Sequence, residues 1–180
     1  MPPVVPAHAA LLRDFANTVD VDEGTDALTG PAALADWLHE RDLLDRRTGA
    51  TEGDLGLARE LRDAVRDAFR ANHDGAAAGP GGALEHVGER LPLALQVCAG
   101  RPRLEPIGTG ARGALTRLLV AAADAGADGS WRRLKICAAG DCAWAFYDTS
   151  KNRSKTWCSM QVCGNRAKTR SYRSRRSADG

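Results

Sequence analysis

The 180-residue sequence has no lysine before position 135 and no long apolar run. A helix that crosses a membrane needs about 20 mainly apolar residues in succession. The first twelve residues, MPPVVPAHAALL, also lack the basic segment that precedes the apolar core of a secretion signal. We therefore expect a cytoplasmic protein with no membrane partner.

Histidine is scarce, and no catalytic spacing is evident. The four histidines lie far apart in the sequence, and no His-Asp-Ser, Cys-His or paired-carboxylate pattern stands out. The glycine-rich stretch 75–82 lacks the Lys and Ser or Thr that complete a phosphate-binding loop. These absences predict that the protein is not an enzyme. The alternative is an enzymatic or small-molecule-binding domain in residues 1–130, with the rest of the chain as an interaction clip.

Charge is divided unevenly along the chain. Residues 1–130 hold 13 Arg, no Lys and 20 acidic residues, for a net charge of −7, whereas residues 131–180 hold 12 Lys or Arg and three Asp, for +9. A solvated surface would explain either half alone but not this sorting. The asymmetry indicates a basic module for a polyanion joined to an acidic body. It predicts two domains, residues 1–130 and 131–180.

The first domain is predicted to be helix-rich α+β with a small antiparallel β element. Helices are expected from Pro31, from Thr51 and over 111–126, because apolar residues recur there at intervals of three and four. Segment 93–108 predicts a hairpin that reverses around Ala99, Gly100, Arg101 and Pro102, with Pro106 confining one strand to an edge, while 72–83 predicts a flexible loop. Cys98 is expected to be a buried thiol without a function.

The remaining four cysteines form two C-x4-C pairs separated by fifteen residues. Paired clasps of this kind are typical of structural zinc, because each tight turn brings two thiolates to the same ion. Two disulfides are the main alternative, which the absence of a signal peptide disfavours, and an iron centre is another. Four sulfur ligands leave no open position for water, so one structural Zn²⁺ per chain is predicted, with the ligands Cys137, Cys142, Cys158 and Cys163.

Between the cysteine pairs, AWAFYDTSKNRSKTW predicts a β-hairpin with a polar tip. Cations at the tip, Lys151, Arg153 and Lys155, are candidate phosphate contacts. The aromatic residues Trp144 and Phe146 could stack on bases, but in so small a module they are expected to form a core beside the metal.

From Ser159, a good N-cap residue, the sequence predicts a helix with two distinct faces. Small residues and Cys163 fall on the face expected to pack on the metal site. The other face is predicted to bind nucleic acid and carries Asn165, Arg166, Thr169, Arg170, Arg173 and Arg176. A metal knuckle, a hairpin and then a helix is the order of a treble-clef zinc finger.

The C-terminal sequence resembles the CGNR zinc finger, named after the run Cys163, Gly164, Asn165, Arg166. The first domain resembles the ABATE domain through DFANTVD at 14–20 and the later ALADWLHERDLL. The resemblance implies a bacterial transcription regulator of stress responses whose N-terminal domain binds a ligand. It also implies that the four cysteines hold zinc and that the helix meeting DNA carries Arg166, Lys168, Arg170 and Arg173.

The polar residues Asp14, Asn17 and Thr18 of DFANTVD are candidates to line a ligand pocket, although such residues also cap helix ends. Taken together, these features predict a DNA-binding regulator whose N-terminal domain senses a ligand or forms a homodimer, because one small finger reads DNA weakly. An RNA-binding or ribosome-associated zinc module is the alternative that charge alone leaves open. The sequence does not indicate the operator, the ligand or the direction of regulation.

Overall fold

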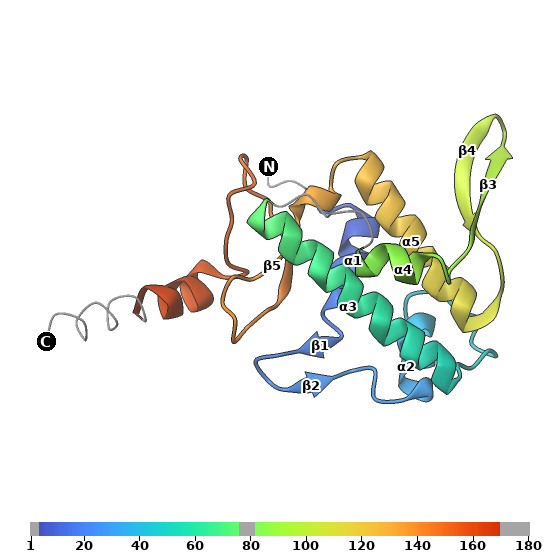
Figure 1. The fold of residues 1–180 in the computed structure, drawn as a ribbon, viewed down its shortest axis with the longest axis horizontal. Coiled ribbons are helices and arrows are strands. Elements are labelled where there is room, and N and C mark those ends of the chain that lie inside the picture. Colours follow the sequence, from blue (N-terminus) through green and yellow to red (C-terminus); the bar gives the residue numbers. More distant parts are fainter. Residues whose placement is uncertain (1–3, 76–81, 170–180) are drawn as a thin grey trace, which may run out of the picture.

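The computed structural model describes residues 4–75 and 82–169. Four longer helices form the body, a two-stranded hairpin projects from one side, and the last described helical segment projects from the opposite end (Figure 1). In chain order the elements are α1 (Ala7–Ala16), β1 (Val19–Asp20), β2 (Thr25–Asp26), α2 (Pro31–His39), α3 (Glu52–Asp74), α4 (Ala83–Gly88), β3 (Leu93–Cys98), β4 (Arg101–Pro106), α5 (Gly110–Ala127), η1 (Trp131–Arg133), β5 (Leu134–Ile136), β6 (Ala145–Tyr147) and η2 (Met160–Gly164).

The predicted helices are confirmed. Pro31 occupies the first turn of α2, where its missing N–H costs nothing. Thr51 and Asp54 form a reciprocal capping box at the start of α3. The main core consists of apolar residues from α1, α2, α3 and α5, and includes the predicted α3 stripe of Leu57, Leu61, Val65 and Phe69. The fold is therefore helix-rich α+β, with three small antiparallel sheets among the described residues.

The hairpin over 93–106 is also confirmed. β3 and β4 pair antiparallel with Cys98 opposite Arg101, and Ala99 and Gly100 form the turn with positive φ angles of 50° and 75°. Both angles lie in the left-handed region that a two-residue hairpin turn requires. The expectation of a buried Cys98 is wrong, because the hairpin stands away from the body and its thiol is exposed.

The strand pairing of the C-terminal module differs from the prediction. β6 pairs with β5, so that Leu134 lies opposite Tyr147 and the first cysteine pair occupies the connection between these strands. Residues 148–157, which were expected to form the polar tip of a hairpin and return as its second strand at Trp157, form an irregular loop. β5 becomes the partner of β6 because Leu134 and Ile136 are buried in the helical core. Directly after β6 the chain curls, because the backbone N–H and hydroxyl of Ser150 and the backbone N–H of Lys155 donate to the carboxylate of Asp148.

The small β5–β6 sheet packs on the helical body. Leu134, Ile136, Ala143 and Ala145 are buried in the same core cluster as the residues of α1 and α3. Residues 134–145 are therefore held by the body, even though they lie beyond the change of charge at position 130.

Candidate metal centre and nucleic-acid interface

The four predicted cysteines come together at one point. Their Sγ atoms all lie within 4.8 Å of one another. The Sγ atom of Cys158 is 3.7 Å from that of Cys142 and 3.7 Å from that of Cys163. Four sulfurs placed about 2.3 Å from a tetrahedral zinc stand about 3.8 Å apart. All four thiols are free of disulfide bonds, so they form a site for one zinc ion.

Burial and the neighbouring sulfurs oppose ionisation of the thiols in this cluster, and a bound metal cation would offset that cost. Burial raises the pKa of Cys142 to about 11, and burial together with the neighbouring Cys163 thiol raises the pKa of Cys158 further. Burial opposes ionisation of Cys137 as well, but backbone hydrogen bonds from Cys158 and Ala139 outweigh it and lower the pKa. Thiols that resist ionisation lose their protons when they bind a cation, so zinc binding here releases protons.

Aromatic side chains surround the metal site. Phe146 is buried with the cysteines, and Trp144 and Trp157 pack against the same cluster. The expectation that these rings form a core beside the metal is therefore confirmed. Lys155 lies over the Phe146 ring, with Nζ 5.3 Å from the ring centroid.

A buried ion pair supports the loop that joins the two cysteine pairs. Nζ of Lys135 donates to Oδ2 of Asp148 at 2.9 Å, and both side chains are almost fully buried. Burial alone would raise the pKa of Asp148, but hydrogen bonds from Ser150 and Lys135 lower it to about 2.

The C-terminal helical segment begins where predicted. The Ser159 hydroxyl accepts a hydrogen bond from the backbone N–H of Val162, and the turns from Met160 to Gly164 are π-helical. Gly164 packs closely: a Cβ there would lie 2.6 Å from the Met160 sulfur, so a larger residue would displace the flexible Met160 side chain. Ordinary helical turns follow over 165–169.

The described cationic candidates lie on the surface of this module. Lys151, Arg153, Arg166 and Lys168 are exposed, Lys155 is half-buried, and the neighbouring Asn165 and Thr169 are exposed. Three further candidates, Arg170, Arg173 and Arg176, lie outside the described residues. The module thus presents cations from the loop and from the start of the helix.

One of these cations already has an anionic partner. Nη1 of Arg166 lies 3.1 Å from Oδ2 of Asp22, in the turn between β1 and β2. The Asp22 carboxylate raises the pKa of Arg166 through this hydrogen bond. Sequence reasoning missed Asp22, because nothing in its local pattern links it to a residue 144 positions away.

The predicted ligand-binding residues have partners within the protein. The Asn17 side chain donates to the backbone carbonyl of Ala145 and accepts from its N–H. The Thr18 hydroxyl donates to the carbonyl of Phe15, and Asp14 pairs with Arg13. Asp14 and Asn17 line a surface hollow of about 620 Å³ beside β6, which Thr18 does not reach. Their role in ligand binding stays a prediction.

Sequence reasoning also missed buried polar contacts from α3 to α1 and to the zinc module. Arg66, which is buried, donates to the carbonyls of Ala16 and Ala143. Asn72 donates to the carbonyls of Trp131 and Leu134. A weak signal existed for the arginine: Arg62 and Arg66 lie four residues apart, beside Leu61 and Val65 on the buried side of α3.

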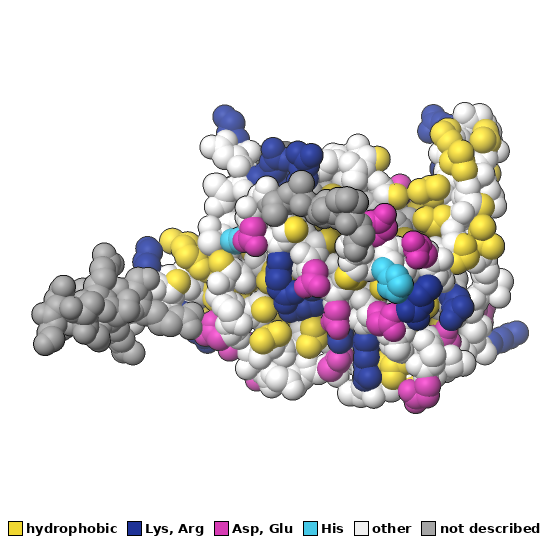
Figure 2. Space-filling model, viewed as in Figure 1, with side chains coloured by type: hydrophobic (Ala, Val, Ile, Leu, Met, Phe, Trp, Pro, Cys, Tyr) yellow, Lys and Arg dark blue, Asp and Glu magenta, His cyan; other side chains and the backbone are white. Residues whose placement is uncertain are grey.

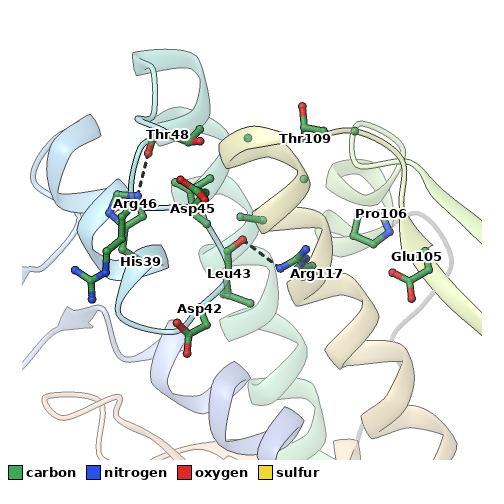
Figure 3. A pocket seen from close by; sticks show the side chains of 15 residues that line it. His39, Asp42, Leu43, Asp45, Arg46, Thr48, Glu105, Pro106, Thr109 and Arg117 are labelled. Carbon is green, nitrogen blue, oxygen red and sulfur yellow. Dashed lines mark hydrogen bonds between the residues drawn. The ribbon is translucent and has the colours of Figure 1, made fainter.

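A separate cavity of about 610 Å³ opens between the α2–α3 connection and the start of α5 (Figure 3). Asp42 and Asp45 lie on one side of it and Arg117 on the other, with Arg117 donating to the Leu43 carbonyl. At the rim of this cavity, Nε2 of His39 donates a hydrogen bond to the Thr48 carbonyl. None of the three predicted ligand residues lines this cavity.

The fold and the four-cysteine centre define a structural zinc finger built onto a helical domain. Comparison with family profiles agrees: the CGNR zinc finger matches residues 133–176, and the ABATE family, described as "Putative stress-induced transcription regulator", matches residues 9–139. The chain therefore belongs to the ABATE family and carries a CGNR zinc finger. A search of curated proteins found no match. None of the helices in the part of the chain described by the structure could cross a membrane.

Proposed function

We propose that this protein is a cytoplasmic transcription regulator that binds double-stranded DNA through its zinc finger. The observation that carries the proposal is the placement of exposed cations around a metal centre with no open coordination position. A Cys₄ site holds a fold and does not catalyse hydrolysis. The exposed cations Lys151, Arg153 and Lys168 can meet phosphates on the outside of that fold, and Arg166 can do so in exchange for Asp22.

The contact between Arg166 and Asp22 supports the same assignment. A carboxylate and a DNA phosphate both accept hydrogen bonds from a guanidinium. Because both side chains are about half exposed, a phosphate can replace Asp22 with little loss. Asn165, next to Arg166, adds a side-chain amide that can read a base edge.

The test is a salt-graded binding assay with the zinc-loaded full chain and a labelled duplex. Neutralising four or five phosphates predicts a slope of log affinity against log salt of about −4. Arg166→Ala combined with Lys168→Ala should reduce that slope by about 2. Arg46→Ala with Arg47→Ala removes the same charge from exposed positions on the acidic body and should leave the slope unchanged. Equal effects of the two double variants would refute the proposed contact face.

Competition separates DNA from RNA. Structured RNA of equal length should displace the duplex poorly if the proposal is correct. Preferential binding of the RNA would support the alternative of an RNA-binding zinc module, since phosphate contacts alone do not distinguish the two polymers.

A further inference from the structure

The β3–β4 hairpin has one polar and one apolar face. The register places Leu93 opposite Pro106, Leu95 opposite Leu104 and Val97 opposite Pro102, so six apolar residues share one face. The other face carries Arg101, Arg103 and Glu105 from β4. Leu95 and Val97 are each 68% exposed. Figure 2 shows hydrophobic side chains along this projecting arm. An isolated two-stranded hairpin is marginally stable in water, so such a face favours a partner.

The two edges of the hairpin differ. Ile107 donates its N–H to the carbonyl of Pro92, which fixes the alternation of the hydrogen-bonded pairs along the hairpin. By that alternation, Pro102 and Pro106 occupy positions whose nitrogen faces outward from β4, and an outer strand could not receive a hydrogen bond there. β4 also packs against α5. The edge of β4 is therefore protected against pairing.

The edge of β3 is unprotected. Its sequence, LALQVC, contains neither a charge nor a proline. The same alternation directs the backbone N–H and C=O groups of Leu93, Leu95 and Val97 away from β4. Within the described residues β3 has β4 as its one strand neighbour. Natural proteins protect exposed edge strands from pairing with charged residues or prolines. In this hairpin such residues occur in β4 and not in β3.

We propose that β3 pairs antiparallel with β3 of a second copy of this chain, which joins the two hairpins into a four-stranded sheet. A two-fold axis at Leu95 sets this residue opposite its own equivalent and Leu93 opposite Val97 of the second copy. On the other face, Ala94 meets Gln96, so no charges are brought together. The edge is thus self-complementary, as an interface between identical chains must be.

This inference rests on the proposed function and deepens it. A single finger reads DNA weakly, whereas a dimer would present two fingers to DNA. Five paired residues on each strand span about 17 Å and bury less than the roughly 1,200 Å² of the smallest stable interfaces. We expect a dimer that dissociates in the micromolar range and is reinforced on DNA.

Sedimentation velocity without DNA tests the interface on the zinc-loaded full chain, over concentrations of about 5 to 200 μM around the expected dissociation constant. The wild type should shift from monomer to dimer. Leu95→Lys places two cations face to face at the axis and should weaken association at least tenfold. Ile107→Lys makes the same change at a residue that is 53% exposed and lies beyond β4, and it should leave the dimer intact.

Cross-linking tests the register. In a Cys98→Ser background, Leu95→Cys should form a covalent dimer with oxidised glutathione, because facing Cα atoms about 5.5 Å apart suit a disulfide. Gln96→Cys should not, because its equivalents would stand roughly 8 Å apart. A monomeric wild type at the highest concentration, or a dimer indifferent to Leu95→Lys, overturns the inference and leaves the edge to a strand of another protein. Loss of duplex binding in an intact dimer would instead refute the proposed function alone.

Discussion

Replacing Asn17 with alanine should destabilise the zinc-loaded protein more than its half-buried position at the C-terminal end of α1 suggests. The Asn17 side chain makes two hydrogen bonds, of 2.9 and 2.7 Å, to the backbone carbonyl and N–H of Ala145. Ala145 is fully buried in the main core. Because β5 pairs with the other side of β6, the alanine variant leaves both backbone groups of Ala145 without these partners.

The size of the effect follows from those two groups. A buried backbone group left without a hydrogen bond costs about 1–3 kcal/mol, so we expect a loss of about 2–4 kcal/mol in the free energy of unfolding. The same change should weaken zinc binding about tenfold or more, because β6 begins three residues after the ligand Cys142 and the body holds that strand in place.

Urea unfolding of the zinc-loaded chain and competition with a chelator measure the two effects. Asp14→Ala is the matched control: it lies in α1, three residues before Asn17, and loses only a partly exposed pair with Arg13, so a change within about 0.5 kcal/mol is expected. If Asn17→Ala were as mild as the control, the zinc finger would not be coupled to the body in the way its contacts indicate.

Three further predictions concern the metal and the charges around it. Cys158→Ser should reduce bound zinc from one per chain to a small fraction in metal analysis, whereas Cys98→Ser, at an exposed thiol outside the cluster, should retain it. Asp22→Asn should raise duplex affinity about two- to fivefold, as expected for removal of an exposed competing ion pair; unchanged affinity would exclude Asp22 as a competitor of phosphate. Asp148→Asn should lower the free energy of unfolding in urea by about 3–5 kcal/mol, because it removes the carboxylate that pairs with the buried ammonium group of Lys135. The folded pKa of Asp148 is lowered to about 2 from 3.8, so this difference should be equal at pH 7 and pH 5 and shrink only as pH falls from about 4 toward 2.

Much of the fold could be predicted from local sequence patterns. The capping box at Thr51, the proline at the start of α2 and the turn at Ala99 and Gly100 each depend on residues within a few positions, so they could be predicted without tertiary information. The spacing of the cysteine ligands is also a local signal, because a C-x4-C turn by itself brings two sulfurs close together.

The predictions were wrong where the structure of a segment depends on contacts with residues far away in the sequence. Alternating aromatics around Phe146 suggested a hairpin closing at Trp157, yet β6 takes β5 as its neighbour because Leu134 and Ile136 are drawn into the helical core. Cys98 was expected to be buried because its segment is apolar; the hairpin carries it away from the body. A strand has two faces and two edges, and the sequence alone does not say which of them is covered.

The sequence by itself determined the ligands of the zinc site, the basic character of the module around it and the helices of the body, because spacing, charge and periodicity are properties of the chain. Tertiary structure decided what those elements meet. It set Asn17 and Arg66 against the backbone of the zinc module, placed Asp22 beside Arg166, and left β3 as an unprotected edge. These contacts join residues far apart in sequence, and their energies depend on burial and on partners that only the folded chain brings together.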